Sequence, residues 1–165
     1  MLGCSDARVP AEIVFDQGLG DLFVIRVAGN IVAPSQVGSV EFASARFGTR
    51  PGRGARPLQC GAILATLEEI RQPTERQSPN LKAIVDRVRP SVEGLVQAGL
   101  HDDVLVREAV RENIRASANH LRHGSQILEQ LIRDEGLLVV GAQYSLETGV
   151  VEFFDGLPVP SGAAG

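Results

Sequence analysis

The sequence lacks several features that would set its class at once. It has no tryptophan, a single tyrosine and a single methionine, and aromatic residues make up only 4% of the chain. No apolar run approaches the roughly 18 residues that a membrane helix needs, and no run of Lys or Arg would attract nucleic acid or an anionic membrane. Residues Met1–Cys4 lack the basic and apolar segments of a secretory signal. These absences predict a cytoplasmic protein that binds neither a membrane nor nucleic acid.

Cysteine is scarce as well, since Cys4 and Cys60 are the only two in the chain. Two cysteines cannot build a disulfide framework. They are either buried apolar thiols, which is the commoner role in such a domain, or metal ligands that the fold brings together. A thiol redox protein is disfavoured, because the sequence has no Cys-x-x-Cys motif.

The overall composition of the chain is typical of a globular domain. The chain has 165 residues, of which 44% are hydrophobic and 22% charged, and its net charge is −4. Chains of this size usually fold as one unit. We therefore expect one domain over residues 1–157 and a flexible tail at 158–165, where small residues and proline dominate.

Strand-like and helix-like segments alternate along the chain. Residues 22–27 predict a buried strand, and residues 137–141 with 150–154 predict a terminal hairpin. Helical patterns fall at 11–17, 34–47, 60–70, 81–97 with Pro90 as a kink or break, 103–123, and 125–134. This alternation predicts an α/β fold, a mostly parallel β-sheet flanked by helices with the C-terminal hairpin at its edge.

Two short segments carry residues suited to chemistry. Cys4, Asp6 and Arg8 place a thiol, a carboxylate and a guanidinium close together, and Cys60 is followed by Gly61. Side chains between strands and helices gather at one edge of a parallel sheet, and zinc accepts thiolate and carboxylate ligands. The alternative is a pair of buried thiols and an ordinary Asp6–Arg8 ion pair.

A set of motifs, taken together, resembles the β-class carbonic anhydrases in order and spacing. The motifs are Cys4–Pro10, Gly20–Asn30, Gly38–Ala43 and Cys60–Ala62. Glu112–Ile114 and Val140–Val151 resemble a later helix and the terminal hairpin of that family. The similarity extends from Gly3 to about Gly156.

The resemblance implies a zinc enzyme that interconverts carbon dioxide and bicarbonate through a zinc-bound hydroxide. It also implies a homodimer or higher homo-oligomer with active sites at the subunit interface. Cys4 and Cys60 match the two zinc-ligand cysteines. Asp6 matches an aspartate that orients the hydroxide or binds the zinc itself, and Arg8 matches the arginine that pairs with this aspartate. Residues of the substrate pocket are matched by Gly29, Asn30 and Gly61.

The sequence departs from the family at the third zinc ligand. Family members carry His-x-x-Cys, whereas the residue three before Cys60 is Pro57, which offers no ligand atom. The chain's histidines fall in helical segments that do not match the position of the family's ligand histidine: His101, His120 and His123. Solvated or core-capping roles are therefore favoured for them. The sequence therefore predicts weak zinc binding and little or no hydration activity. The alternative is a non-catalytic homologue that acts as an oligomer subunit or binding module.

Two longer segments also depart from the family. Residues 51–58 contain two prolines and two glycines where an apolar strand is expected. The family's N-terminal arm and first strand, which lead into the segment of Cys4, are expected to be missing.

A change of reading frame accounts for residues 51–58. Codons for these residues can be chosen so that a shift of one base reads Leu-Val-Val-Val-Leu-Gly-His-Ser, which restores an apolar strand and places histidine at position 57. The protein sequence fixes the first and third bases of each shifted codon, and the middle bases are a choice. We therefore hypothesise a compensated pair of single-base changes in the gene or in its sequencing.

Overall fold

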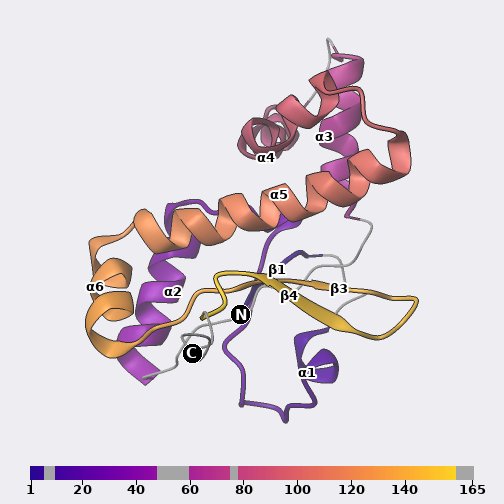
Figure 1. Ribbon diagram of the computed structural model, residues 1–165. Coiled ribbons are helices and arrows are strands. Elements are labelled where there is room, and N and C mark those ends of the chain that lie inside the picture. The colour runs from indigo at the N-terminus through magenta and orange to yellow at the C-terminus, as the bar shows by residue number, and fades with distance from the viewer. Residues whose placement is uncertain (6–9, 48–59, 75–77, 159–165) are drawn as a thin grey trace, which may run out of the picture.

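Helices dominate the computed structural model, which describes residues 1–5, 10–47, 60–74 and 78–158 (Figure 1). The elements, in chain order, are β1 (Leu2–Gly3), α1 (Ala11–Val14), β2 (Ile25–Arg26), the 3-10 turn η1 (Ala28–Asn30), α2 (Pro34–Phe47), α3 (Gly61–Arg71), α4 (Pro79–Gln97), α5 (Asp102–His123), α6 (Gln126–Glu135), β3 (Gly141–Tyr144) and β4 (Val151–Asp155). None of the helices in these ranges is both long enough and apolar enough to span a membrane.

The longest helix, α5, crosses the molecule and organises the other elements. α3 and α4 pack together and against one end of it, whereas α6 folds back against the other end beside α2 (Figure 1). The β3–β4 hairpin lies along the side of α5. This arrangement follows from the apolar stripe of α5, whose buried residues include Leu105, Val110, Ile114 and Leu121.

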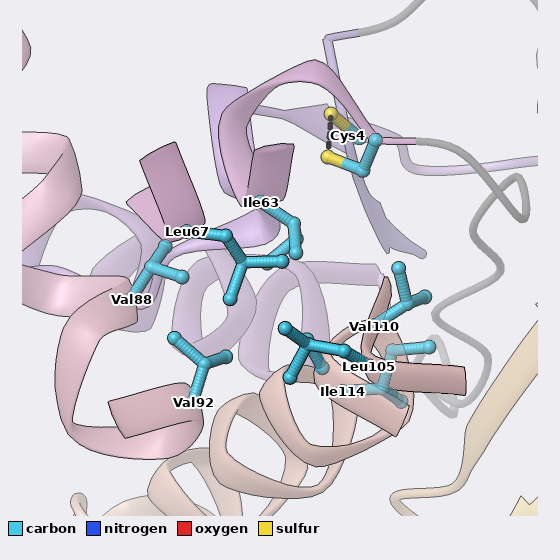
Figure 2. Close-up of a cluster of buried hydrophobic side chains, with 10 residues drawn as sticks. Cys4, Ile63, Leu67, Val88, Val92, Leu105, Val110 and Ile114 are labelled. Atoms are coloured by element: carbon cyan, nitrogen blue, oxygen red, sulfur yellow. Dashed lines mark hydrogen bonds between the residues drawn. The ribbon is translucent and has the colours of Figure 1, made fainter. Parts of the chain in front are cut away.

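The larger apolar core lies between α3, α4 and α5. Figure 2 shows its side chains converging from the three helices, and the labelled members are Ile63, Leu67, Val88, Val92, Leu105, Val110 and Ile114. Burying one such side chain contributes roughly 1.5–3 kcal/mol relative to leaving it exposed. Cys4 and Cys60 belong to the same cluster, so the predicted ligand segments are anchored to the core.

Strand pairing in the described residues is limited to two pairs. β1 runs parallel to β2, with Leu2 opposite Ile25, and β3 runs antiparallel to β4. The sequence predicts a longer parallel sheet, but residues 51–58, where the family has a central strand, lie outside the described residues. A short strand, β1, does lead into Cys4, although the sequence predicts that the first strand is missing.

Most helices begin and end near their predicted positions. α2 covers 34–47 as expected, and α6 begins after Ser125, whose Oγ accepts a hydrogen bond from the Leu128 amide at 3.2 Å. α1 ends at Val14 and is shorter than predicted. Of the kink or break predicted at Pro90, the break does not occur, because α4 continues through this residue.

The terminal hairpin is confirmed, but its first strand starts later than predicted. Gly136 ends α6 in a left-handed conformation, and the Leu137 amide donates to the Leu131 carbonyl oxygen. Leu137 then packs into a second apolar cluster with Leu128 and Leu121. The segment 137–140 therefore packs against helices, and strand pairing with β4 begins at Gly141. Of the predicted tail at 158–165, residues 159–165 lie outside the described part of the chain.

Candidate metal centre

Cys4 is held in place by its link to β2. Its carbonyl oxygen accepts a hydrogen bond from Arg26 Nε at 3.0 Å, and the amide of the next residue, Ser5, donates to the Val27 carbonyl at 3.2 Å. At the other end of β1, the Met1 amino group donates to the Phe23 carbonyl oxygen at 2.6 Å, and burial lowers the pKa of this amino group. Cys4 thus follows a short strand, β1, that is hydrogen-bonded to the β2 segment at both of its ends.

Cys60 is held by the start of α3. It is the N-cap residue, with extended backbone angles, and its carbonyl oxygen accepts hydrogen bonds from the amides of Ile63 and Leu64 at 3.0 and 3.1 Å. Gly61 is the first helical residue, one position later than predicted. The helix dipole favours a negatively charged group at this end, which suits a thiolate ligand.

The fold brings the two cysteines together. Their Sγ atoms lie 3.5 Å apart, joined by the dashed line at Cys4 in Figure 2, and both residues are buried. Two sulfurs bound to one zinc at about 2.3 Å and at the tetrahedral angle lie roughly 3.8 Å apart. The observed spacing is close to that value. The pair therefore fits two corners of a tetrahedral zinc site.

The described residues do not complete the ligand set. Asp6, Arg8 and Pro57 lie outside them. Within the described ranges, no group of three or more His, Cys, Asp or Glu side chains is placed to hold a metal. Three histidines lie on or beside α5, and all are exposed, as expected for solvated side chains: His101, His120 and His123.

The loop of Gly29 and Asn30 lies beside the start of α3. Both residues have left-handed backbone angles, with φ of 68° and 53°. A Cβ on Gly29 would lie 3.3 Å from Ala62 Cβ and 3.3 Å from Val88 Cγ2, so the loop passes close to the turn that carries Cys60. Of the predicted site, the structure therefore brings together Cys4 and Cys60, with Gly61 next to Cys60 in the chain and Gly29 against Ala62.

Helix α5 supports this loop through Asn113 and Ser117, to which the sequence analysis gave no role, although Asn113 lies in the Glu112–Ile114 motif. Asn113 Nδ2 donates to the Gly29 carbonyl oxygen at 3.0 Å, and Ser117 Oγ donates to the Asn30 carbonyl oxygen at 2.9 Å. Both side chains are buried. The sequence did hold a signal for these contacts, since Asn113 and Ser117 fall on the apolar stripe of α5. A polar side chain that is buried on such a stripe needs a hydrogen-bond partner.

A pocket of about 280 Å³ lies beside the segment that follows this loop. Its lining includes Ile31 from that segment, Pro34 from α2, Arg87 from α4, and Ser117 and His120 from α5. Neither cysteine lines it. This pocket is therefore separate from the candidate metal centre.

Comparison with known proteins identifies the family. A sequence model of the carbonic anhydrase family matches residues 1–151. The chain is 35% identical over 152 residues to a carbonic anhydrase of Mycolicibacterium smegmatis, a match that covers 92% of this chain and 72% of that protein.

Solved structures support the same conclusion. The fold is similar to the β-carbonic anhydrase CafA of Aspergillus fumigatus, with a TM-score of 0.80, 21% identity, and coverage of 96% of this chain and 75% of that one. It is also similar to β-carbonic anhydrases of Sordaria macrospora described as tetrameric, with a TM-score of 0.76, 22% identity, and coverage of 93% and 78%. These neighbours confirm the α/β fold class. Sequence and structure agree over almost the whole chain, and the chain belongs to the β-class carbonic anhydrase family.

Proposed function

We propose that the chain catalyses the reversible hydration of carbon dioxide to bicarbonate at a zinc ion held by Cys4, Cys60 and Asp6, with weak metal binding and low activity. The observation that carries the proposal is the pair of buried Sγ atoms 3.5 Å apart, at positions that match the family's ligand cysteines. A bound zinc ion supplies a water whose pKa is lowered to about 7, which makes a nucleophile available at neutral pH.

The chain's own residues then have separate roles. Cys4 and Cys60 supply two thiolates from the end of a strand and the start of a helix. The Asp6 carboxylate is suited either to binding the metal or to accepting a hydrogen bond from the nucleophile, and Arg8 is suited to holding that carboxylate. Gly29, Asn30 and Gly61 would border the substrate pocket, and an added Cβ on Gly61 would meet no described atom within 4 Å.

Weak binding follows from the ligand count. Structural and catalytic zinc sites in proteins use at least three protein ligands. Pro57 takes the place of the family's histidine and has no donor atom, so a three-ligand site has to use Asp6 beside Cys4 and Cys60. If Asp6 binds the metal, it is no longer available to orient the nucleophile. We therefore expect both zinc affinity and turnover to be low.

We further infer a homodimer or a higher homo-oligomer in the cytoplasm. The large apolar side chains that are solvent-exposed in the single chain include Ile13 at 79%, Leu19 at 99% and Phe42 at 55%. Association would remove them from water. Thiol ligands also suit a reducing compartment, where cysteines stay reduced.

The direct test is zinc content per chain together with carbon dioxide hydration, both measured on one purified sample. We expect clearly less than one zinc per chain and slow hydration, and both should fall further in Cys60→Ser. The matched control is His101→Gln, at an exposed histidine, which should change neither quantity. Full zinc occupancy with fast hydration that survives Cys60→Ser would contradict the proposal.

The alternative function is a non-catalytic homologue that acts as an oligomer subunit or binding module. Pro57 at the ligand position is the observation that favours it. A stable oligomer with negligible zinc and no hydration, unchanged by Cys4→Ser, would support this alternative over the enzyme.

A further inference from the structure

Cys4 and Cys60 are 56 positions apart in the sequence, yet their sulfur atoms lie 3.5 Å apart in the core. An S–S bond is about 2 Å long, so bond formation requires an approach of roughly 1.5 Å. That is less than the movement of a sulfur atom between neighbouring χ1 rotamers. We propose that Cys4 and Cys60 form an intrachain disulfide when the chain is metal-free and meets hydrogen peroxide.

The surrounding structure keeps the two thiols facing each other. Cys4 follows β1, which is paired with β2, and Cys60 caps α3, which is packed into the core through Ile63 and Leu67. Both anchors are regular elements, so the pair does not depend on a chance encounter of two loops. A pair fixed in this way has a high effective concentration, which favours reaction within the chain over reaction between chains.

The reaction balances with peroxide as the two-electron oxidant. The Cys4 sulfur attacks one peroxide oxygen, the O–O bond breaks, and a sulfenic acid forms as hydroxide leaves. The Cys60 sulfur then attacks the Cys4 sulfur, the S–O bond breaks, and the S–S bond forms. Hydroxide leaves and takes up a thiol proton to become water. Two thiols are oxidised, and one peroxide is reduced to two water molecules. Cys4 reacts first because it keeps 7% exposure, whereas Cys60 has none.

The disulfide has two consequences for the chain. It links β1 covalently to the start of α3 and closes the intervening segment into a ring, which should raise resistance to unfolding. It also uses both sulfurs that zinc would need, so oxidation and zinc binding exclude each other. Only this second consequence rests on the proposed function, because the disulfide requires the thiol geometry alone.

The test follows thiols and mass, and it does not depend on hydration activity. The reduced, chelator-treated chain is exposed to a stoichiometric amount of hydrogen peroxide under native conditions, then denatured and alkylated with a maleimide. We expect two reactive thiols before oxidation and none afterwards, in a monomer lighter by two hydrogen atoms. Dithiothreitol should restore both thiols. Thiols that stay reactive, or masses that gain oxygen on separate sulfurs, would overturn the proposal.

Matched measurements separate the role of the fold from ordinary thiol chemistry. Cys4→Ser and Cys60→Ser each leave one thiol, and neither variant should form the intrachain product. Because a core variant can misfold, the native chain is also oxidised in urea, where the disulfide should form at least about tenfold more slowly. Equal rates in urea and in buffer would show that the fold does not create the pair. Added zinc should slow oxidation if both sulfurs bind it, which tests the proposed function separately.

Discussion

Asn113, in the middle of α5, donates a hydrogen bond from Nδ2 to the carbonyl oxygen of Gly29 at 3.0 Å, across 84 positions of sequence. Gly29 in turn lies against Ala62, in the first turn of α3 after Cys60. The longest helix therefore supports the loop that borders the candidate metal centre. Ser117, one turn further along α5, supports the same loop through the Asn30 carbonyl oxygen.

Replacing Asn113 should destabilise the protein through this loop. Asn113→Ala leaves the Gly29 carbonyl without its buried donor, and we expect a loss of about 1–3 kcal/mol in the free energy of unfolding. Asn119→Ala is the control, because Asn119 lies on the same helix but is exposed, and its effect should stay within about 0.5 kcal/mol. Urea denaturation measures both. Equal effects of the two variants would show that the hydrogen bond carries no stability.

Gly29 should be sensitive to any side chain. In Gly29→Ala, a φ of 68° costs roughly 1–2 kcal/mol for a residue with a Cβ, and the new atom would lie 3.3 Å from both Ala62 and Val88. Gly99→Ala is the matched control, because Gly99 has a φ of 67° with no neighbouring atom within 4 Å. Thermal or urea unfolding should show a larger loss at Gly29. A larger loss at Gly99 would contradict the close approach of the loop to α3.

The β3–β4 hairpin should contribute a pH-dependent stability. Arg111 donates two hydrogen bonds to Glu152 and lies 3.9 Å above the ring of Phe154. These hydrogen bonds hold the pKa of the Glu152 carboxyl below its ordinary value. A carboxyl with a lowered pKa stabilises the fold above its unfolded pKa and loses this contribution as the pH falls through the folded value.

The measurement is the unfolding free energy between neutral pH and pH values below about 4. Glu152→Gln should lose stability at neutral pH and should show a smaller further loss on acidification than the unchanged chain. The effect should be modest, because Glu152 is largely exposed. Glu147→Gln, in the turn of the same hairpin, removes a carboxylate without removing the Arg111 contact, and it should not cause the loss at neutral pH that Glu152→Gln causes. Identical pH profiles for Glu152→Gln and the unchanged chain would refute the role of this ion pair.

The DNA sequence of the gene gives an independent test of residues 51–58. If two compensating base changes produced this segment, the shifted frame should read an apolar strand followed by the histidine codon at position 57. The middle bases of the shifted codons decide the outcome, since the protein sequence does not fix them. Middle bases that spell polar residues would exclude the frame-shift hypothesis.

The helices were the most predictable part of the fold. The positions of α2 and α5 follow from the apolar periodicity of the sequence. Pro90 was less predictable, because packing of α4 between α3 and α5 keeps that helix continuous. The start of β3 was missed, since an apolar run from 137 reads as a strand although part of it packs against helices.

The candidate site was predictable in part. Cys4 and Cys60 carry suitable chemistry, but the sequence alone left buried thiols and metal ligands as alternatives, and the family resemblance decided between them. Their contact depends on tertiary packing across 56 positions, which no local pattern encodes. Asn113 and Ser117 were missed for the same reason, because their partners are backbone atoms of a distant loop.

The most direct test of the central claim is zinc content per chain before and after repair of residues 51–58. The repaired chain carries Leu-Val-Val-Val-Leu-Gly-His-Ser in this segment, and a matched control carries the same segment with alanine at position 57. We expect near-stoichiometric zinc and fast hydration only in the repaired chain, because the thiol pair supplies two ligands and the histidine supplies a third. Stoichiometric zinc in the unchanged chain or in the alanine control would contradict this account of the site.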